Sequence, residues 1–68
     1  MKKQDKARKA LSRTIDRRFT LLEQERIEWG GDTETEDTYS WHFTLDQQRF
    51  ELVYGYRSKT VTECSKRT

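Results

Sequence analysis

The sequence predicts an α+β fold in which one long N-terminal amphipathic helix packs on a two- or three-stranded antiparallel β-meander, in the order αββ(β). Two sequence patterns and the chain length support this prediction. Apolar residues recur at helical spacing in the first half, and they alternate with polar residues in the second half, as in half-buried strands. With 68 residues, the chain is long enough for a single small domain, 1–68, with a modest core.

The predicted helix covers residues 5–29, a stretch with neither proline nor glycine. Its apolar residues share an arc of about 120° on a helical wheel. They are Ala7, Leu11, Ile15, Phe19, Leu22 and Trp29. The Asp5 carboxylate is suited to cap the first turn. Gly30 and Gly31 are expected to end the helix, because glycine adopts the left-handed conformation at a helix C-terminus without strain.

An alternative interpretation divides this helix at Thr20. Residues 20–23 (TLLE) fit a capping box, in which the threonine hydroxyl and the glutamate carboxylate each satisfy a backbone amide. Arg26 also falls on the apolar arc, where a hydrophobic residue is expected. A single helix is preferred, because the apolar spacing continues to Trp29 and no turn residue separates the two halves.

The second half predicts an acidic connector over residues 30–38, mostly loop, followed by a β-hairpin over residues 39–57. A turn at Gln47-Gln48 places Leu45 opposite Phe50, so that apolar residues face one another across the strands. A four-residue loop in this register is preferred, since Gln-Gln is a poor two-residue turn.

A possible third strand covers residues 59–63, with Val61 beside Tyr54 on the core face, and residues 64–68 form a polar tail. The helix, at about 36 Å, is longer than a seven-residue strand of about 23 Å. Because Trp29 is tied to the sheet by a short connector, the basic N-terminal end of the helix is expected to overhang the sheet.

The net charge of +2 conceals a strong segregation of charge. Residues 1–18 carry eight basic and two acidic side chains, a net charge of +6, whereas residues 19–38 carry one basic and seven acidic side chains, a net charge of −6. Residues 39–68 carry five basic and three acidic side chains, a net charge of +2. Such asymmetry is typical of an interaction surface or of self-association.

Catalysis is not expected from these residues. His42 and Cys64 lie on one sheet face but on strands separated by the middle strand, roughly 10 Å apart and beyond hydrogen-bond reach. The acidic connector lacks the glycine and the final glutamate of a calcium loop, and the single cysteine excludes an intramolecular disulfide and a cysteine-based zinc site. We expect no enzyme activity, no cofactor and no metal. Without a signal peptide or membrane-spanning segment, a cytoplasmic location is expected, and no membrane partner.

The best candidate for a binding site is a basic ridge on the helix. Its five side chains lie within about 80° of one another on a helical wheel, and they are Lys2, Lys6, Lys9, Arg13 and Arg17. A negatively charged protein or nucleic-acid surface would complement this ridge. The alternative is an ordinary solvated helix surface. A secondary acidic patch is predicted in the connector at Glu34, Glu36 and Asp37.

The sequence therefore favours a non-catalytic small binding protein that acts through its basic helix face. We interpret it as a protein-binding inhibitor or adaptor of the kind that phages and mobile elements encode. The alternative function is sequence-independent nucleic-acid binding, with phosphates contacting the same ridge, because the aromatic residues are expected in the core and not on a stacking platform. A homodimer is a third possibility, since the segments of opposite charge would attract each other in an antiparallel pair.

Overall fold

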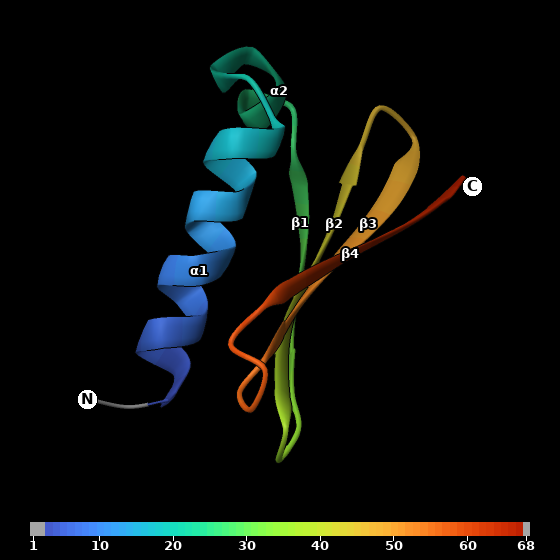
Figure 1. Cartoon of the computed structure of the whole chain (residues 1–68). Helices are drawn as coiled ribbons and strands as arrows, with labels where there is room; N and C mark the ends of the chain where they lie inside the picture. The colour runs from blue at the N-terminus through green and yellow to red at the C-terminus, as the bar shows by residue number, and fades with distance from the viewer. Residues whose placement is uncertain (1–2, 68) are drawn as a thin grey trace.

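The computed structural model describes residues 3–67, and the side chains of residues 4–65. Its elements, in chain order, are α1 (Lys3–Arg18), α2 (Leu21–Glu25), β1 (Glu28–Glu34), β2 (Thr38–Leu45), β3 (Gln48–Gly55) and β4 (Val61–Arg67). The strands form one antiparallel sheet in the order β1-β2-β3-β4, and α1 lies along one face of this sheet (Figure 1). The α+β prediction is confirmed, but the sheet has four strands, one or two more than predicted.

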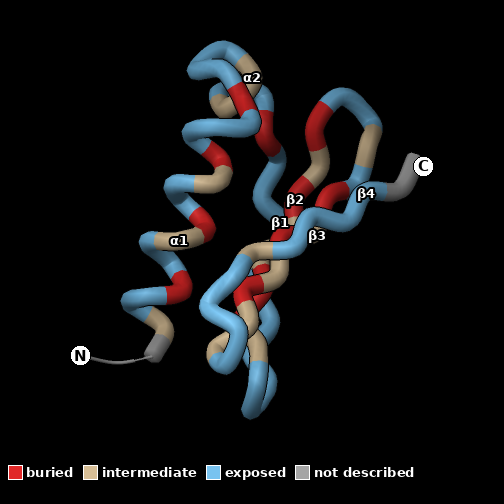
Figure 2. Tube along the Cα trace, viewed as in Figure 1, coloured by how far each residue is buried: buried red, intermediate tan, exposed pale blue. Residues whose placement is uncertain are grey.

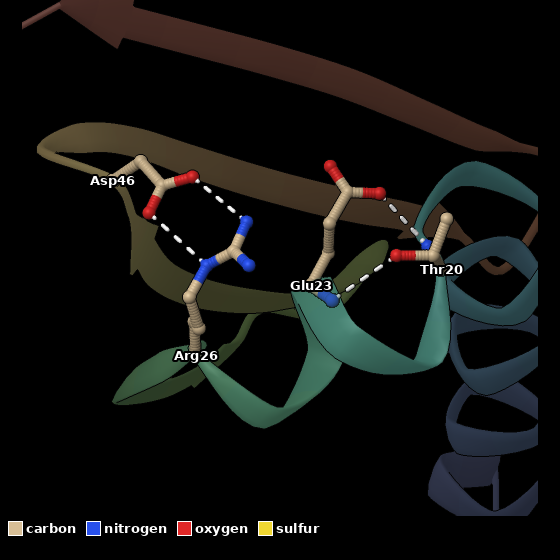
Figure 3. A network of polar contacts seen from close by, with 4 residues as sticks. All are labelled: Thr20, Glu23, Arg26 and Asp46. Carbon is tan, nitrogen blue, oxygen red and sulfur yellow. Dashed lines mark hydrogen bonds and ion pairs between the residues drawn. The ribbon is translucent and has the colours of Figure 1, made fainter.

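The prediction of one helix over residues 5–29 is wrong, because the chain breaks after Phe19. The Thr20 hydroxyl accepts a hydrogen bond from the Glu23 amide at 3.1 Å, and the Glu23 carboxylate accepts one from the Thr20 amide at 2.8 Å (Figure 3). This capping box starts the five-residue α2 in a new direction. As a result, Leu22 leaves the apolar stripe and is 70% exposed.

Most of the predicted acidic connector is the edge strand β1. It pairs antiparallel with β2 from Glu28 opposite Thr44 to Glu34 opposite Tyr39. The register shifts between Trp29 and Gly31, and Gly31 has φ of 118°, a conformation that glycine adopts more easily than other residues. The two glycines therefore form a β-bulge and do not end a helix.

The hairpin of β2 and β3 exists as predicted, but its register differs by two residues. Leu45 pairs with Gln48, and Phe43 pairs with Phe50. Asp46 and Gln47 form a two-residue turn with φ of 50° and 67°, and positive values at both positions are typical of the type I′ turn that suits twisted hairpins. Because side chains alternate with a period of two, a shift of two residues leaves every apolar side chain on its predicted face.

The last strand is longer than the predicted third strand at residues 59–63, and it begins and ends further along the chain. β4 runs from Val61 to Arg67 and includes most of the predicted polar tail. The chain reverses through residues 56–60, where Lys59 has φ of 57° and its amide donates to the Gly55 carbonyl oxygen at 2.8 Å. Val61 pairs with Tyr54 and packs against the core, as predicted.

The core lies between α1 and the sheet (Figure 2). Its buried residues from the helical half are Ala7, Leu11, Ile15, Phe19 and Ile27, and those from the sheet are Tyr39, Phe43, Leu45, Phe50, Leu52 and Tyr54. The Phe19 ring meets Phe43 and Phe50 edge-on, with ring centroids 5.7 and 5.4 Å away. The aromatic residues of the hairpin are thus mainly part of the core.

The N-terminal end of α1 does not overhang the sheet, contrary to the prediction. At 16 residues, α1 is about 24 Å long, close to the length of the strands. Ala7 and Leu11, in its first half, are fully buried. The shorter helix follows directly from the break at Thr20, because α1 ends at Arg18 and residues 19–29 of the predicted element are not part of it.

Candidate functional site

The basic ridge lies on the face of α1 that points away from the sheet. Lys6, Lys9, Arg13 and Arg17 are all exposed, whereas Ala7, Leu11 and Ile15 on the opposite face are buried. This arrangement follows from the helical period of 3.6 residues, which separates the two sets on the wheel by about half a turn. Lys2, the fifth predicted member of the ridge, lies outside the described residues.

Two groups of basic residues differ in their contacts, and Arg8, Arg49 and Lys59 belong to neither group. In one group, each guanidinium group pairs with a carboxylate: Arg18 with Glu63 (3.3 Å), Arg26 with Asp46 (3.1 Å, Figure 3) and Arg57 with Asp37 (3.4 Å). Within the part of the chain that the structure describes, Lys6, Lys9, Arg13 and Arg17 make no ion pair and no side-chain hydrogen bond. The ridge therefore retains its charge for an external partner.

The predicted acidic patch lies at the turn between β1 and β2, where Glu36 is exposed. Its other two members have partners within the chain. Glu34 accepts hydrogen bonds from the Gln4 amide at 3.0 Å and from the Tyr56 hydroxyl at 2.6 Å, and Asp37 pairs with Arg57. Partial burial, assisted by the Glu34 carboxylate, raises the pKa of Tyr56 to about 12. Glu34 and Asp37 thus stabilise the fold locally.

His42 and Cys64 are on strands separated by β3, as predicted. His42 pairs with Glu51, and Glu51 pairs with Cys64, so the three residues form one row across the sheet. The His42 Nε2 atom lies 3.6 Å from Glu51 Oε2 and 3.1 Å from Thr33 Oγ1. In the described part of the chain, no three His, Cys, Asp or Glu side chains are grouped as a metal site requires.

One surface feature was not predicted from the sequence: a hollow of about 430 Å³ between α1 and β1. We call it the α1–β1 groove, and its lining residues are Arg8, Trp29, Gly31, Asp32, Tyr39 and Trp41. Sequence reasoning placed Trp29 on the buried face of a helix, whereas it lies on β1 and is 56% exposed. The alternation of apolar and polar residues over 27–29, next to Gly30 and Gly31, is the feature of the sequence that indicates a strand here.

Hydrogen bonds around Tyr39 hold the groove together. The Tyr39 hydroxyl donates to Asp32 Oδ2 at 2.5 Å and accepts a hydrogen bond from Trp41 Nε1 at 3.2 Å. A hydrogen bond with Tyr39 also raises the pKa of Arg8, and the negative charges of Asp32 and Asp5 add to this shift. The groove therefore has polar atoms that are already paired and an aromatic surface that is partly exposed.

Comparison with protein families, with curated proteins and with solved structures finds no match to this chain. No helix among the described residues is long and apolar enough to cross a membrane. The chemistry of the two surfaces, the basic ridge and the α1–β1 groove, is therefore the basis on which a function is inferred.

Proposed function

We propose that this chain is a non-catalytic binding protein, an inhibitor or adaptor, that holds a negatively charged surface of a protein partner on the basic ridge of α1. The observation that carries this proposal is the gathering of four cations on one helix face without a partner among the described residues. Arg18, Arg26 and Arg57 are paired with carboxylates of the chain, while the four described ridge residues are exposed and unpaired. A set of like charges on one helix face weakens an isolated helix slightly, so this pattern brings no benefit to folding.

The acidic turn between β1 and β2 favours a compact protein surface over a long polyanion. The hydrogen bond between Gln4 and Glu34 brings this turn close to the N-terminal end of α1. A nucleic acid that continued beyond the ridge at that end would meet Glu34 and Glu36, which would repel its phosphates. A protein partner with a local acidic patch would avoid this repulsion.

The proposal is tested with paired charge reversals. Capture from a lysate of the cell in which the protein acts is compared for the wild-type chain, for Arg13→Glu/Arg17→Glu and for Arg57→Glu/Lys59→Glu. Both double variants change the net charge by the same amount, but the second alters exposed residues away from the ridge. We expect one specific protein to be lost only with the first variant, while circular dichroism stays unchanged. Equal capture by both variants would refute the role of the ridge.

Nucleic-acid binding is the second candidate, because the described ridge presents four unpaired cations without an acidic residue among them. Fluorescence anisotropy with labelled duplex and single-stranded oligonucleotides distinguishes it from the first. Phosphate binding would give a linear fall of log affinity with log salt concentration, and Lys9→Glu would reduce the slope. An unchanged anisotropy at low salt would eliminate this candidate and leave the protein partner.

A further inference from the structure

The sheet is wider than the helix that covers it, and β1 is the strand left uncovered. α1 packs mainly over β3, with β2 and β4 beside it, and all seven residues of β1 are exposed. Strands are about 4.8 Å apart, so β1 lies about 10 Å from β3. This distance is similar to the 8–10 Å that separates two packed helices, roughly the space that a second helix needs beside α1.

The ribbons of α1 and β1 diverge from one end of the helix to the other. In Figure 1 they come together at α2 and separate towards the other end of α1, where the Gln4 side chain still reaches Glu34 at 3.0 Å. The α1–β1 groove is located between them, with Arg8 contributed by α1 and Trp29 by β1. A helix that followed β1 would lie over this groove and would bury the inner face of the strand.

The aromatic surface of the groove is suited to binding. The Trp29 ring packs edge-on against Trp41, with centroids 5.5 Å apart, and it contacts Phe43 at 5.3 Å, yet it remains 56% exposed. The Trp41 indole nitrogen is held by Tyr39, which is itself fixed by Asp32. Tryptophan, tyrosine and arginine are the residues that dominate binding energy at interfaces, and here they are ordered before any partner arrives.

The charge around the groove indicates what kind of partner fits. The negative charges of Asp32 and Asp5 both act on Arg8, the one basic side chain among the described residues that line the groove. Glu34 extends the acidic row along the inner face of β1. The lining itself has one acid, Asp32, and one base, Arg8, and the neighbouring carboxylates Asp5 and Glu34 add negative charge around it, so a partner with basic residues beside an apolar stripe complements this surface.

We propose that the α1–β1 groove docks an amphipathic helix of a protein partner, with an apolar stripe on Trp29 and Trp41 and basic residues beside Asp5, Asp32 and Glu34. Strand addition at β1 is disfavoured, because the bulge at Trp29 and Gly31 twists this edge and carboxylates line the strand. This second surface differs from the basic ridge in its charge and its position, so the two are tested separately.

The test uses two synthetic model peptides with the same amphipathic pattern and no tryptophan, one made of leucine and lysine and the other of leucine and glutamate. The only tryptophans of the chain are Trp29 and Trp41, so its intrinsic fluorescence reports on the groove itself. We expect the leucine–lysine peptide to shift the emission to shorter wavelength in a saturable manner and to reduce quenching by acrylamide. The leucine–glutamate peptide should do neither.

Two variants locate the binding site. Trp29→Ala removes the exposed aromatic wall and is expected to weaken binding by about tenfold or more, with Trp41 as the remaining reporter. Asp5→Lys alters an exposed side chain without changing the core, and it should also weaken binding. Because it removes an acid from the first turn of α1, it should lower the thermal unfolding temperature slightly, and binding is measured well below that temperature. The matched control, Arg13→Gln/Arg17→Gln, changes the ridge and should bind like the wild type.

Three results would overturn the proposal. The first is the same emission shift with both peptides, or no shift with either. The second is an affinity that Trp29→Ala and Asp5→Lys leave intact, which would place the peptide elsewhere. The third is a shift that appears on concentrating the protein alone, which would make a second copy of the chain the occupant of the groove.

Discussion

Beneath α1, β3 is packed in the hydrocarbon core, whereas β1, beyond its backbone pairing with β2 and the contacts of Trp29, is attached by hydrogen bonds to its carboxylates. Leu52 of β3 and Leu11 of α1 are fully buried in one core cluster. On β1, Asp32 binds the Tyr39 hydroxyl, and Glu34 binds Gln4 and Tyr56. Burial of apolar side chains contributes more free energy than partly exposed hydrogen bonds do. The comparison teaches that β1 is the less firmly held strand and the one whose inner face is available to a partner.

The largest effect is expected in the packed region. Leu11→Ala should lower the free energy of unfolding by about 2–5 kcal/mol, because it removes buried contacts and leaves a cavity under the helix. Such a loss is a large fraction of the stability of so small a domain. Urea unfolding followed by circular dichroism measures it.

The control is a leucine of the same size outside this region. Leu22 on α2 is 70% exposed, and Leu22→Ala should change stability by less than about 0.5 kcal/mol. Equal losses for the two variants would contradict the placement of the helix break at Thr20, since a single continuous helix would bury both leucines on one stripe.

A smaller effect is expected where β1 is attached. Tyr39→Phe preserves the buried ring but removes the hydroxyl that joins Asp32, Trp41 and Arg8. The free energy of unfolding should fall by about 1–3 kcal/mol, because partly buried polar groups lose their partner.

Tyr54→Phe is the matched control for this variant. Tyr54 is also buried, but its hydroxyl has no hydrogen-bond partner among the described residues. Its loss should change stability by less than about 0.5 kcal/mol. If both variants lose the same amount of stability in urea unfolding, the hydroxyl network does not hold β1.

Hydrophobic periodicity alone was sufficient to identify the packed region from the sequence. The spacing of Ala7, Leu11, Ile15 and Phe19 gave the buried face of α1, and alternation gave the inner faces of β2 and β3. The helix break was not predicted, because the apolar spacing that continues to Trp29 favours one helix more strongly than the four-residue capping box at residues 20–23 favours two. The hairpin register was missed, because its turn needs positive φ at Asp46 and Gln47, and glutamine rarely adopts it.

The attachment of β1 could not be predicted from the hydrophobic pattern. For this reason the α1–β1 groove was not predicted either. Its inner residues after the bulge are Asp32 and Glu34, which look like solvent-facing positions until Tyr39 and Tyr56 are placed beside them. The helix face that carries Lys6, Lys9, Arg13 and Arg17 is exposed as the helical period predicts, and its role in binding stays a prediction. The exposed face of a single helix can be predicted from the sequence, whereas a groove between α1 and β1 needs the tertiary structure.

The smallest predicted effect is a pH dependence at the end of β1. The pKa of Tyr56 is raised from 10.0 to about 12, mainly by burial and then by Glu34, so the folded state favours the neutral phenol. This contribution to stability is therefore complete below about pH 10 and is lost as the pH rises towards 12. The urea midpoints of the wild type and of Tyr56→Phe should differ most at about pH 9. They should approach each other as the pH is raised to about 11.5, which lies inside this window. Because the two chains differ only at residue 56, the pH dependence that they share cancels in the difference between their midpoints. A constant difference over this range would mean that the bond to Glu34 does not help to hold β1, and that α2 and the pairing with β2 keep the strand in place by themselves.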